Sequence, residues 1–280
     1  MSEKLTAKIF DFFITTKCTM SCKLCAAAIP YIEHPKHTPK EIAFREMQEF
    51  FKIWDYAERV ELIGGEPLMH PDICEIAKET LKYKDQFGGI RVTTNATIVP
   101  SDDLLEFAAS CDKYFDFVVD DYGELSKNLI PLTTKLDKYG VPYRVDVYHG
   151  ENQRFGGWVY FGDYNKQDHS KEKLQSIFKN CIAPKNSFYC VNDGKVFSCC
   201  YALSLYLVKG LLPHDGGYID LFDNSIGVDE KRKIAKGFCK VPIGACHYCH
   251  GFDNENGQRY LGPPEQLLKK RGHVYEYYRQ

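Results

Sequence analysis

The sequence predicts an α/β protein with a parallel sheet or barrel, followed by a small cysteine-rich segment. Up to about residue 150, β-rich runs alternate with amphipathic runs, which is the order of right-handed βα units. Beyond residue 180 that alternation gives way to turn dipeptides and recurring cysteines. A length of 280 residues has room for one large domain and a small appendage.

Five runs are expected as strands of the sheet: residues 9–16, 59–64, 89–96, 114–120 and 141–149. Helices are expected between them at residues 38–56, 71–83, 101–109 and 124–140. Thr38 is the expected N-cap of the first helix, with Pro39 in its first turn, and Ser101 is the expected N-cap of the third. Pro131 predicts a kink or a break in the fourth helix, which ends at Gly140.

The predicted domain boundary lies near residue 180. Residues 150–180 are expected to add one more βα unit, so that the barrel spans residues 1–180. Residues 181–262 lack long apolar helices and form the expected appendage, which needs a metal because its core is small. Residues 263–280 are expected as a C-terminal helix or tail.

Charge and hydropathy exclude several classes of partner. The net charge of −2 provides no strong field for nucleic acid or an anionic membrane surface. No apolar stretch of about 18 residues spans a bilayer, and the N-terminus lacks the features of a signal peptide. We therefore expect a cytoplasmic protein whose twelve cysteines stay reduced. Clustered reduced cysteines favour metal ligands or catalytic groups, whereas Cys74 and Cys111 stand alone and are expected as small hydrophobic residues.

Cys18, Cys22 and Cys25 form a C-x3-C-x2-C motif in the loop after the first predicted strand. Three thiolates are too few for a closed zinc site and one short of a full 4Fe–4S ligand set. A zinc loop completed by a distant His or Cys is the alternative. The motif and its place after the first strand resemble the signature of the radical S-adenosylmethionine (SAM) superfamily.

A second motif follows the second predicted strand, at Gly64, Gly65, Glu66 and Pro67. Two glycines let the backbone approach a ligand closely, and backbone carbonyls or the Glu66 carboxylate accept hydrogen bonds from an ammonium group. An ordinary strand-ending turn is the alternative. The segment resembles the GGEP motif of the same superfamily, which holds the amino group of the methionine moiety of SAM.

The resemblance implies a fold, a cofactor set and a chemistry. The implied fold is a partial (β/α)6 TIM-like barrel with its site at the carboxyl ends of the strands. A 4Fe–4S cluster with one open iron binds SAM, and reduction, by a protein such as flavodoxin or ferredoxin, yields a 5′-deoxyadenosyl radical. That radical abstracts hydrogen from a small-molecule substrate, while the protein positions the reactants and excludes water from the site.

Polar residues at the strand ends are further candidates. By resemblance, Asn95 lies near SAM. From their places at the strand ends, Asp120 is a candidate to bond the ribose hydroxyls and Arg144 to pair with the carboxylate of SAM or with the substrate. A structural hydrogen-bonding role is the alternative for each of these residues. Asp121 and Tyr122 are the candidate proton acceptors.

The second cysteine group has the spacing of an auxiliary cluster. Cys181 and Cys199 flank Gly194 in a C-x12-G-x4-C block, and Cys246 and Cys249 form a downstream C-x2-C pair. This pattern resembles the auxiliary-cluster region of SPASM and Twitch enzymes, and the absence of a cysteine after Cys249 favours the one-cluster Twitch arrangement. The resemblance implies four ligands to a second 4Fe–4S cluster. A structural zinc ribbon is the alternative, and three further cysteines remain as substitute ligands: Cys190, Cys200 and Cys239.

This spacing is similar to that of 2-deoxy-scyllo-inosamine dehydrogenase-like enzymes. The resemblance implies oxidation of a secondary alcohol of a sugar or cyclitol to a ketone, with the auxiliary cluster accepting an electron. The alternatives are a radical SAM dehydratase or epimerase of a sugar, a peptide-modifying SPASM-type enzyme, and a non-enzymatic zinc-binding interaction protein. Four residues after the fifth strand either line a substrate pocket or, as we favour, close the barrel core: Tyr148, Arg154, Trp158 and Tyr160.

Overall fold

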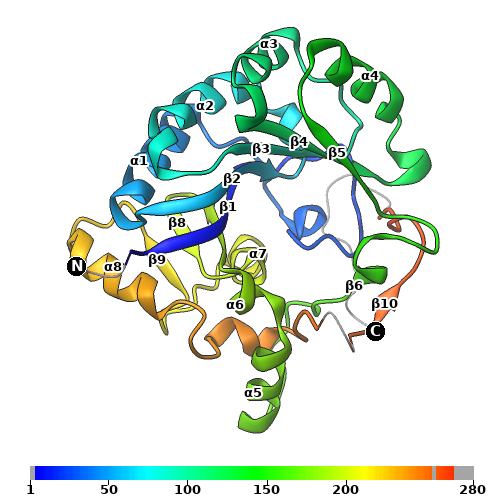
Figure 1. Cartoon of the computed structure of the whole chain (residues 1–280). Coiled ribbons are helices and arrows are strands. Elements are labelled where there is room, and N and C mark those ends of the chain that lie inside the picture. Colours follow the sequence, from blue (N-terminus) through cyan, green and yellow to red (C-terminus); the bar gives the residue numbers. More distant parts are fainter. Residues whose placement is uncertain (1–3, 254–256, 268–280) are drawn as a thin grey trace.

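The frame of the protein is one curved, mostly parallel sheet with helices along its outer face (Figure 1). The computed structural model describes residues 4–253 and 257–267. The strand order is β5-β4-β3-β2-β1-β7-β8-β9, in which β1 to β5 and β7 are parallel and β8 and β9 are antiparallel to their neighbours. The strands are β1 Thr6–Thr15, β2 Tyr56–Gly64, β3 Ile90–Thr94, β4 Phe115–Asp121, β5 Tyr143–Val147, β7 Phe188–Asn192, β8 Lys195–Phe197 and β9 Tyr218–Asp220. The predicted α/β fold is confirmed.

The connections between the first five strands are helical, as the sequence predicts. The helices are α1 Lys40–Ile53, α2 Ile73–Thr80, α3 Asp102–Ser110 and α4 Leu129–Tyr139. Short 3-10 helices lie at Ile29–Tyr31, Pro67–Met69, Leu81–Gln86, Asp112–Tyr114, Gly123–Leu125, Arg154–Gly156 and Gly244–Tyr248. Because side chains alternate along a strand, Phe117 and Val119 of β4 pack against the helices, and Asp116 and Asp120 face the concave inner side, the barrel lumen.

Two helix details differ from the prediction. Pro39 occupies the N-cap position of α1, and the buried Thr38 hydroxyl instead donates to the Phe13 carbonyl over 3.1 Å. Pro131 causes no kink because α4 begins at Leu129, so the missing N–H is one of the first-turn donors that lack a helical partner anyway. The Ser101 cap of α3 and the Gly140 end of α4 are confirmed.

The extra βα unit expected from residues 150–180 does not join the sheet. Strand β6, Trp158–Val159, pairs antiparallel with β10, Arg259–Tyr260, in a separate two-stranded sheet. Helix α5, Lys171–Asn180, follows it. Gly157 has a φ of +132°, and a Cβ there would lie 2.9 Å from the Tyr260 carbonyl oxygen. A residue with a side chain would be strained at this position, so the pairing of β6 with β10 depends on a glycine here.

The cysteine-rich part continues the barrel sheet. Strand β7 pairs with the free side of β1, and Tyr189 and Phe238 pack on Trp54, with ring centroids 5.5 and 6.2 Å away. The part also contains α6 Ile182–Asn186, α7 Cys200–Lys209 and α8 Val228–Gly237. Helix α7 is apolar and largely buried, which corrects the expectation that apolar helices end before residue 181. The domain boundary at residue 181 stays a prediction.

Residues 264–267 run in extended form beside the loop that follows β1, through the bridge between Cys22 and Gln266. The remainder of the expected C-terminal helix, residues 268–280, lies outside the described residues. None of the helices described is both long and apolar enough to cross a membrane.

Candidate functional site

Cys18, Cys22 and Cys25 converge in the loop after β1, where N–H groups are aimed at two of the three sulfurs. Burial, together with the charges of the neighbouring thiols, raises the pKa of Cys18 and of Cys22 to about 12. Cys18 accepts a hydrogen bond from the backbone N–H of Met20 at 3.4 Å. Cys22 accepts one from the Gln266 side-chain amide at 3.2 Å. Burial raises the pKa of Cys25, and the backbone groups of Ile29, Ala27 and Ala28 oppose this rise.

Such donors suit thiolates. A thiolate has no proton to donate and needs hydrogen-bond donors, so N–H groups around buried sulfurs prepare them to carry negative charge. A metal or cluster iron supplies the compensating positive charge and lowers the pKa of its thiol ligands. The donor set therefore fits thiolate ligation of a metal centre.

The glycines of the Gly64–Pro67 segment hold it against the cysteine loop. A Cβ on Gly64 would lie 2.0 Å from the Thr15 carbonyl oxygen, and one on Gly65 would lie 2.1 Å from that of Lys17. The Gly65 N–H donates to Thr15 and the Glu66 N–H donates to Lys17, each over 2.9 Å. The two motifs thus form one unit at the carboxyl ends of β1 and β2.

The Glu66 carboxylate is engaged within the protein. It is fully buried and accepts hydrogen bonds from the Leu68 N–H at 3.0 Å, the Thr94 hydroxyl at 2.8 Å and the Asn95 N–H at 2.8 Å. Burial raises its pKa to about 7. Glu66 therefore ties the end of β2 to the end of β3. Its backbone carbonyl accepts the Met69 N–H at 3.0 Å, and the Pro67 carbonyl accepts the His70 N–H at 2.9 Å.

Asn95 joins this unit from β3. Its side-chain amide donates to Cys18 Sγ at 3.5 Å and to the Thr19 hydroxyl at 3.2 Å, and its oxygen accepts from the backbone N–H of Thr97 at 3.0 Å. The structure thus brings Asn95 and the two predicted motifs together.

The carboxyl ends of β4 and β5 add a second polar group on the lumen side. Asp120 and Asp146 are neighbours across the two strands. Asp146 binds Arg144 at 3.1 Å and Arg154 at 2.7 Å. Asp120 Oδ2 accepts from the Tyr122 hydroxyl at 3.1 Å, whereas the buried Oδ1 has no partner among the described residues. Burial raises the pKa of Asp120 to about 8.

Asp121 points to the other side of β4. Its carboxylate accepts from the Gly123 N–H at 2.8 Å and contacts His149 at 3.1 Å. Of the two candidate proton acceptors, Tyr122 lies on the site side. Burial, and next the Asp120 charge, raise the pKa of Tyr122, and the charge of Cys22 is near enough to add to the effect.

Aromatic rings surround the Tyr122 side chain. The centroids of Tyr122, Tyr148 and Trp158 lie 5.3 to 5.7 Å from one another. Tyr148 and Trp158 are only half-buried, and neither belongs to the two hydrophobic core clusters. The expectation that these rings close the barrel core is therefore wrong, and they form a wall beside Asp120.

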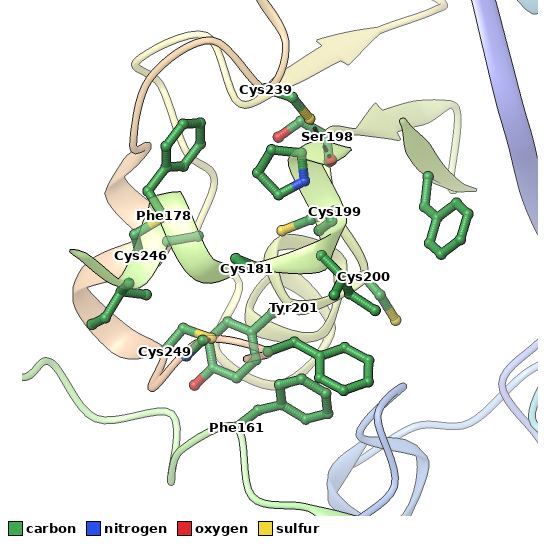
Figure 2. A pocket seen from close by; sticks show the side chains of 18 of the residues that line it. Phe161, Phe178, Cys181, Ser198, Cys199, Cys200, Tyr201, Cys239, Cys246 and Cys249 are labelled. Atoms are coloured by element: carbon green, nitrogen blue, oxygen red, sulfur yellow. Dashed lines mark hydrogen bonds between the residues drawn. The ribbon is translucent and has the colours of Figure 1, made fainter. Parts of the chain in front are cut away.

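The second cysteine group lines a cavity of about 200 Å³ (Figure 2). Cys181 precedes α6, Cys199 is the N-cap of α7, and Cys246 and Cys249 belong to the segment that follows α8. Burial, and next the charges of Cys246, Cys249 and Cys181, raise the pKa of Cys199. The Ala202 N–H donates to Cys199 Sγ at 3.4 Å, and the Gly251 N–H donates to Cys249 Sγ at 3.2 Å.

The three remaining cysteines nearby act as hydrogen-bond donors. Cys239 Sγ donates to the Ser198 carbonyl at 3.4 Å, as Figure 2 shows. Cys200 Sγ donates to the Ala26 carbonyl at 3.5 Å and is turned away from the other four sulfurs (Figure 2). Cys190 Sγ donates to the Asp11 carboxylate at 3.8 Å. Cys200 and Cys239 also line the cavity, but their sulfurs lie against these backbone carbonyls, and Cys190 is not part of the lining.

All twelve cysteines are free. Within residues 4–253 and 257–267, no three His, Cys, Asp or Glu side chains are grouped so that they hold one metal ion directly. A 4Fe–4S cluster has a different requirement, because its cysteines ligate separate irons around a larger core. The loop motif with its N–H donors and the cysteine-lined cavity fit that requirement.

Fold and site define a class: an α/β barrel with a three-cysteine loop after its first strand. Residues 12–137 match the family model described as the Radical SAM superfamily. This segment of the chain is a radical SAM domain, and it contains the cysteine loop, the Gly64–Pro67 segment, Asn95 and Asp120. The family implies a 4Fe–4S cluster and SAM.

Curated relatives match a shorter stretch. GTP 3',8-cyclases of two Campylobacter jejuni subspecies, doylei and jejuni, are each 30% identical over 88 residues, which is 31% of this chain. The chain spans 27% of the length of these relatives.

Solved structures share the fold over most of the chain. A histidine-tagged form of anSMEcpe with bound AdoMet has a TM-score of 0.55 at 11% identity and covers 93% of this chain and 92% of its own. Native anSMEcpe with bound AdoMet and a peptide has a TM-score of 0.53 at 12% identity and covers 93% of each. BtrN in complex with AdoMet and 2-DOIA has a TM-score of 0.48 at 14% identity and covers 95% and 100%. At these identities the likeness to the two anSMEcpe structures shows the fold alone.

Two residues at the site have no motif in the sequence. Asp146 lies two positions after Arg144 on the same face of β5, and that period-2 spacing was the available signal. Gln266 reaches Cys22 from 244 residues away and has no local signal.

Proposed function

We propose that this radical SAM enzyme oxidises a secondary alcohol of a small sugar or cyclitol to a ketone. The observation that carries the proposal is the cavity beside the barrel sheet, lined by Cys181, Cys199, Cys246 and Cys249. Alcohol oxidation removes one hydrogen atom from carbon, one proton from oxygen and one further electron. A second cluster in that cavity would be the acceptor for the electron.

Cys18, Cys22 and Cys25 would hold the SAM-binding cluster, and the N–H groups aimed at the sulfurs of Cys18 and Cys22 support this assignment. When bound, cluster and SAM together supply the 5′-deoxyadenosyl radical for hydrogen abstraction. The carbonyls of Gly64 and Gly65 would accept the SAM ammonium, since the Glu66 carboxylate and the carbonyls of Glu66 and Pro67 are already engaged. Asn95 would position Cys18 through its side-chain amide.

Two groups would complete the SAM site. The unpartnered Asp120 Oδ1 is a ready acceptor for ribose hydroxyls, because a buried carboxylate oxygen without a hydrogen bond costs free energy. Arg144 would pair with the carboxylate of SAM or of the substrate, beside its contact with Asp146.

The aromatic wall of Tyr122, Tyr148 and Trp158 would hold the substrate. Ring faces pack on the C–H faces of a sugar or cyclitol, and Arg154 and Asp146 offer a donor and an acceptor to its hydroxyls. Tyr122, already hydrogen bonded to Asp120, would receive the alcohol proton in exchange for passing its own to that carboxylate. Asp121 would take no part in this proton transfer, since its carboxylate accepts the Gly123 N–H and contacts His149.

The setting we propose is the cytoplasm, with flavodoxin or ferredoxin as reductant. Twelve free cysteines are typical of a reducing compartment, where thiols persist. Two loaded clusters would bring about eight irons per chain after anaerobic reconstitution. A colourless protein with zinc in place of iron would instead favour the zinc-binding interaction protein.

The decisive experiment is anaerobic turnover. The reconstituted protein is incubated with SAM, reduced flavodoxin and a panel of alcohols headed by 2-deoxy-scyllo-inosamine. We expect a ketone and one 5′-deoxyadenosine per product. A deoxy or epimeric product without net electron loss would establish the dehydratase or epimerase alternative. GTP belongs in the panel because part of the chain is similar to GTP 3',8-cyclase, and its consumption would contradict the proposal.

A further inference from the structure

The C-terminal segment Glu265–Leu267 lies against the cysteine loop and delivers one side chain to it. The Gln266 amide nitrogen lies 3.2 Å from Cys22 Sγ, although 244 positions separate the two residues. Cys18 receives the Met20 N–H of its own loop and the Asn95 side-chain amide from the end of β3. The donor to Cys22 comes from a distant part of the chain.

The segment is fixed at several points, so the contact is not a chance approach of a mobile side chain. The Lys23 N–H donates to the Glu265 carbonyl and the Leu267 N–H donates to the Ser21 carbonyl, each over 2.8 Å. These two bonds enclose the antiparallel bridge between Cys22 and Gln266. The Leu267 side chain is buried, with 7% of its surface exposed.

The orientation of the Gln266 amide is also fixed. Its oxygen accepts the Ser21 N–H at 2.8 Å, and its nitrogen donates to the Pro264 carbonyl at 3.0 Å as well as to Cys22. The amide has two N–H groups, so both donors are used. A flipped amide would set its oxygen against Cys22 and its nitrogen against the Ser21 N–H, which would lose all three bonds.

A donor at this sulfur has a redox consequence. Reduction adds negative charge to a cluster and its thiolates, and hydrogen bonds to the sulfurs favour that charge, so they raise the reduction potential. An amide that is held in place provides this stabilisation without reorganisation, as preorganised donors do.

We propose that Gln266 is a positioning residue that raises the reduction potential of the SAM-binding cluster through its hydrogen bond to the Cys22 thiolate. The inference rests on the proposed assignment of Cys18, Cys22 and Cys25 as ligands of that cluster. It does not depend on the identity of the substrate or on alcohol oxidation.

The test is a potentiometric titration of the reconstituted protein followed by electron paramagnetic resonance. The signal that changes on addition of SAM identifies the SAM-binding cluster and separates it from any auxiliary cluster. Gln266→Glu is the first variant, because it keeps the oxygen that accepts from Ser21 and replaces only the donor. Gln266→Leu removes both functions at similar size.

We expect the ratio of reduced to oxidised cluster at a fixed potential to fall about tenfold in Gln266→Leu, the size of one lost hydrogen bond, and further in Gln266→Glu because of the added charge. Tenfold corresponds to about 59 mV for a one-electron couple. Glu265→Gln is the matched control: it removes the neighbouring 3.0 Å ion pair with Lys23 and is expected to keep the wild-type potential.

A wild-type potential in either Gln266 variant with its cluster loaded overturns the proposal. If Gln266→Leu loads no cluster, Gln266→Glu decides by the same criterion. An equal shift in Glu265→Gln also overturns it, since the effect would then belong to the segment and not to the amide. Because no substrate is used, failure of the proposed alcohol oxidation leaves this result intact.

Discussion

The hydrogen bonds at sulfur differ among the cysteines that line the cavity. Cys199 and Cys249 accept N–H groups at the cavity, whereas Cys200 and Cys239 donate to backbone carbonyls. Spacing in the sequence leaves that choice open, because neighbouring cysteines such as Cys199 and Cys200 differ by a single position. The distinction arises from α7, which begins at Cys200 and turns the two side chains to different sides.

The distinction predicts different outcomes for two cysteine substitutions. Cys246→Ala removes a residue of the cavity and is expected to lower the iron content by about four per chain, the content of one cluster. Cys239→Ala removes a thiol that donates to Ser198 and is expected to leave the iron content unchanged. Iron and sulfide analysis after anaerobic reconstitution measures both. Equal losses in the two variants would show that Cys239 is a ligand.

Substitution of Gly65 tests how tightly the cysteine loop and the Gly64–Pro67 segment are coupled. In Gly65→Ala the new Cβ would lie 2.1 Å from the Lys17 carbonyl oxygen and 3.0 Å from Cys18 Cβ, so the cysteine loop must shift. We expect a loss of about 1–3 kcal/mol in unfolding free energy and weaker binding of SAM. Gly237→Ala is the control, since a Cβ there meets nothing within 4 Å. Thermal unfolding and SAM titration measure the two effects, and wild-type SAM affinity would contradict the coupling.

Single residues also mark the limit of sequence reasoning at the site. The cysteine motifs and the Gly64–Pro67 segment were recognisable because their residues are close in sequence. Gln266 was not, since its contact with Cys22 depends on how the whole chain returns to its first loop. Glu66 was recognised, but its three hydrogen bonds within the protein appear only when β2 and β3 lie side by side.

At the level of elements, the sequence predicts those strands and helices whose apolar residues recur with a clear period. The five parallel strands and their four helices followed from alternating apolar and amphipathic runs, and their bounds differ by a few residues. Helix α7 was missed because it is apolar on nearly all sides, so it has no 3.6-residue stripe. Strand β6 was assigned to the barrel because neither its shortness nor its pairing with β10 is visible in local sequence.

A buried carboxyl couples helix α1 to the β7–β8 hairpin and predicts a pH effect on stability. Glu46 accepts the Gly194 N–H over 2.6 Å, and burial raises its pKa from 4.5 to about 8. Asp193 adds to this effect, and Lys36 and Lys195 oppose it. Between pH 4.5 and 8 the folded protein therefore keeps a proton that the unfolded chain has lost, and stability falls as pH rises.

Glu46→Gln removes the titrating group and keeps an oxygen for Gly194. We expect the variant to lack the loss of stability that Glu46 causes as pH rises. Its melting temperature should therefore exceed that of the wild type by a margin that grows from about pH 5 to about pH 8. The slope for one group is at most about 1.4 kcal/mol per pH unit. Glu49→Gln, on the same helix, is expected to follow the wild-type trend. A constant difference between Glu46→Gln and wild type across this range would contradict the pKa.

For the whole molecule, the cysteine-rich part and the barrel share one sheet and one core cluster. Strand β7 pairs with β1 over Ile9 to Phe12, and Tyr189, Val191 and Phe238 belong to the same core cluster as the barrel residues. Sequence patterns suggested a boundary at residue 181 because composition changes there, but composition says nothing about which strand edge the next segment covers. The covered edge belongs to β1, whose end carries the cysteine loop.

This arrangement predicts that residues 1–180 do not fold alone. Such a fragment would expose the edge of β1 and the apolar side chains that now pack on β7 to β9, and both features promote aggregation. We expect the fragment to be insoluble or to lack a cooperative melting transition, measured by circular dichroism beside the full chain. A monomeric fragment that melts cooperatively and binds about four irons would show instead that the barrel is an independent domain. In the fragment the cysteine loop would also lose Gln266, so a soluble form should hold its cluster at a lower reduction potential than the full chain does.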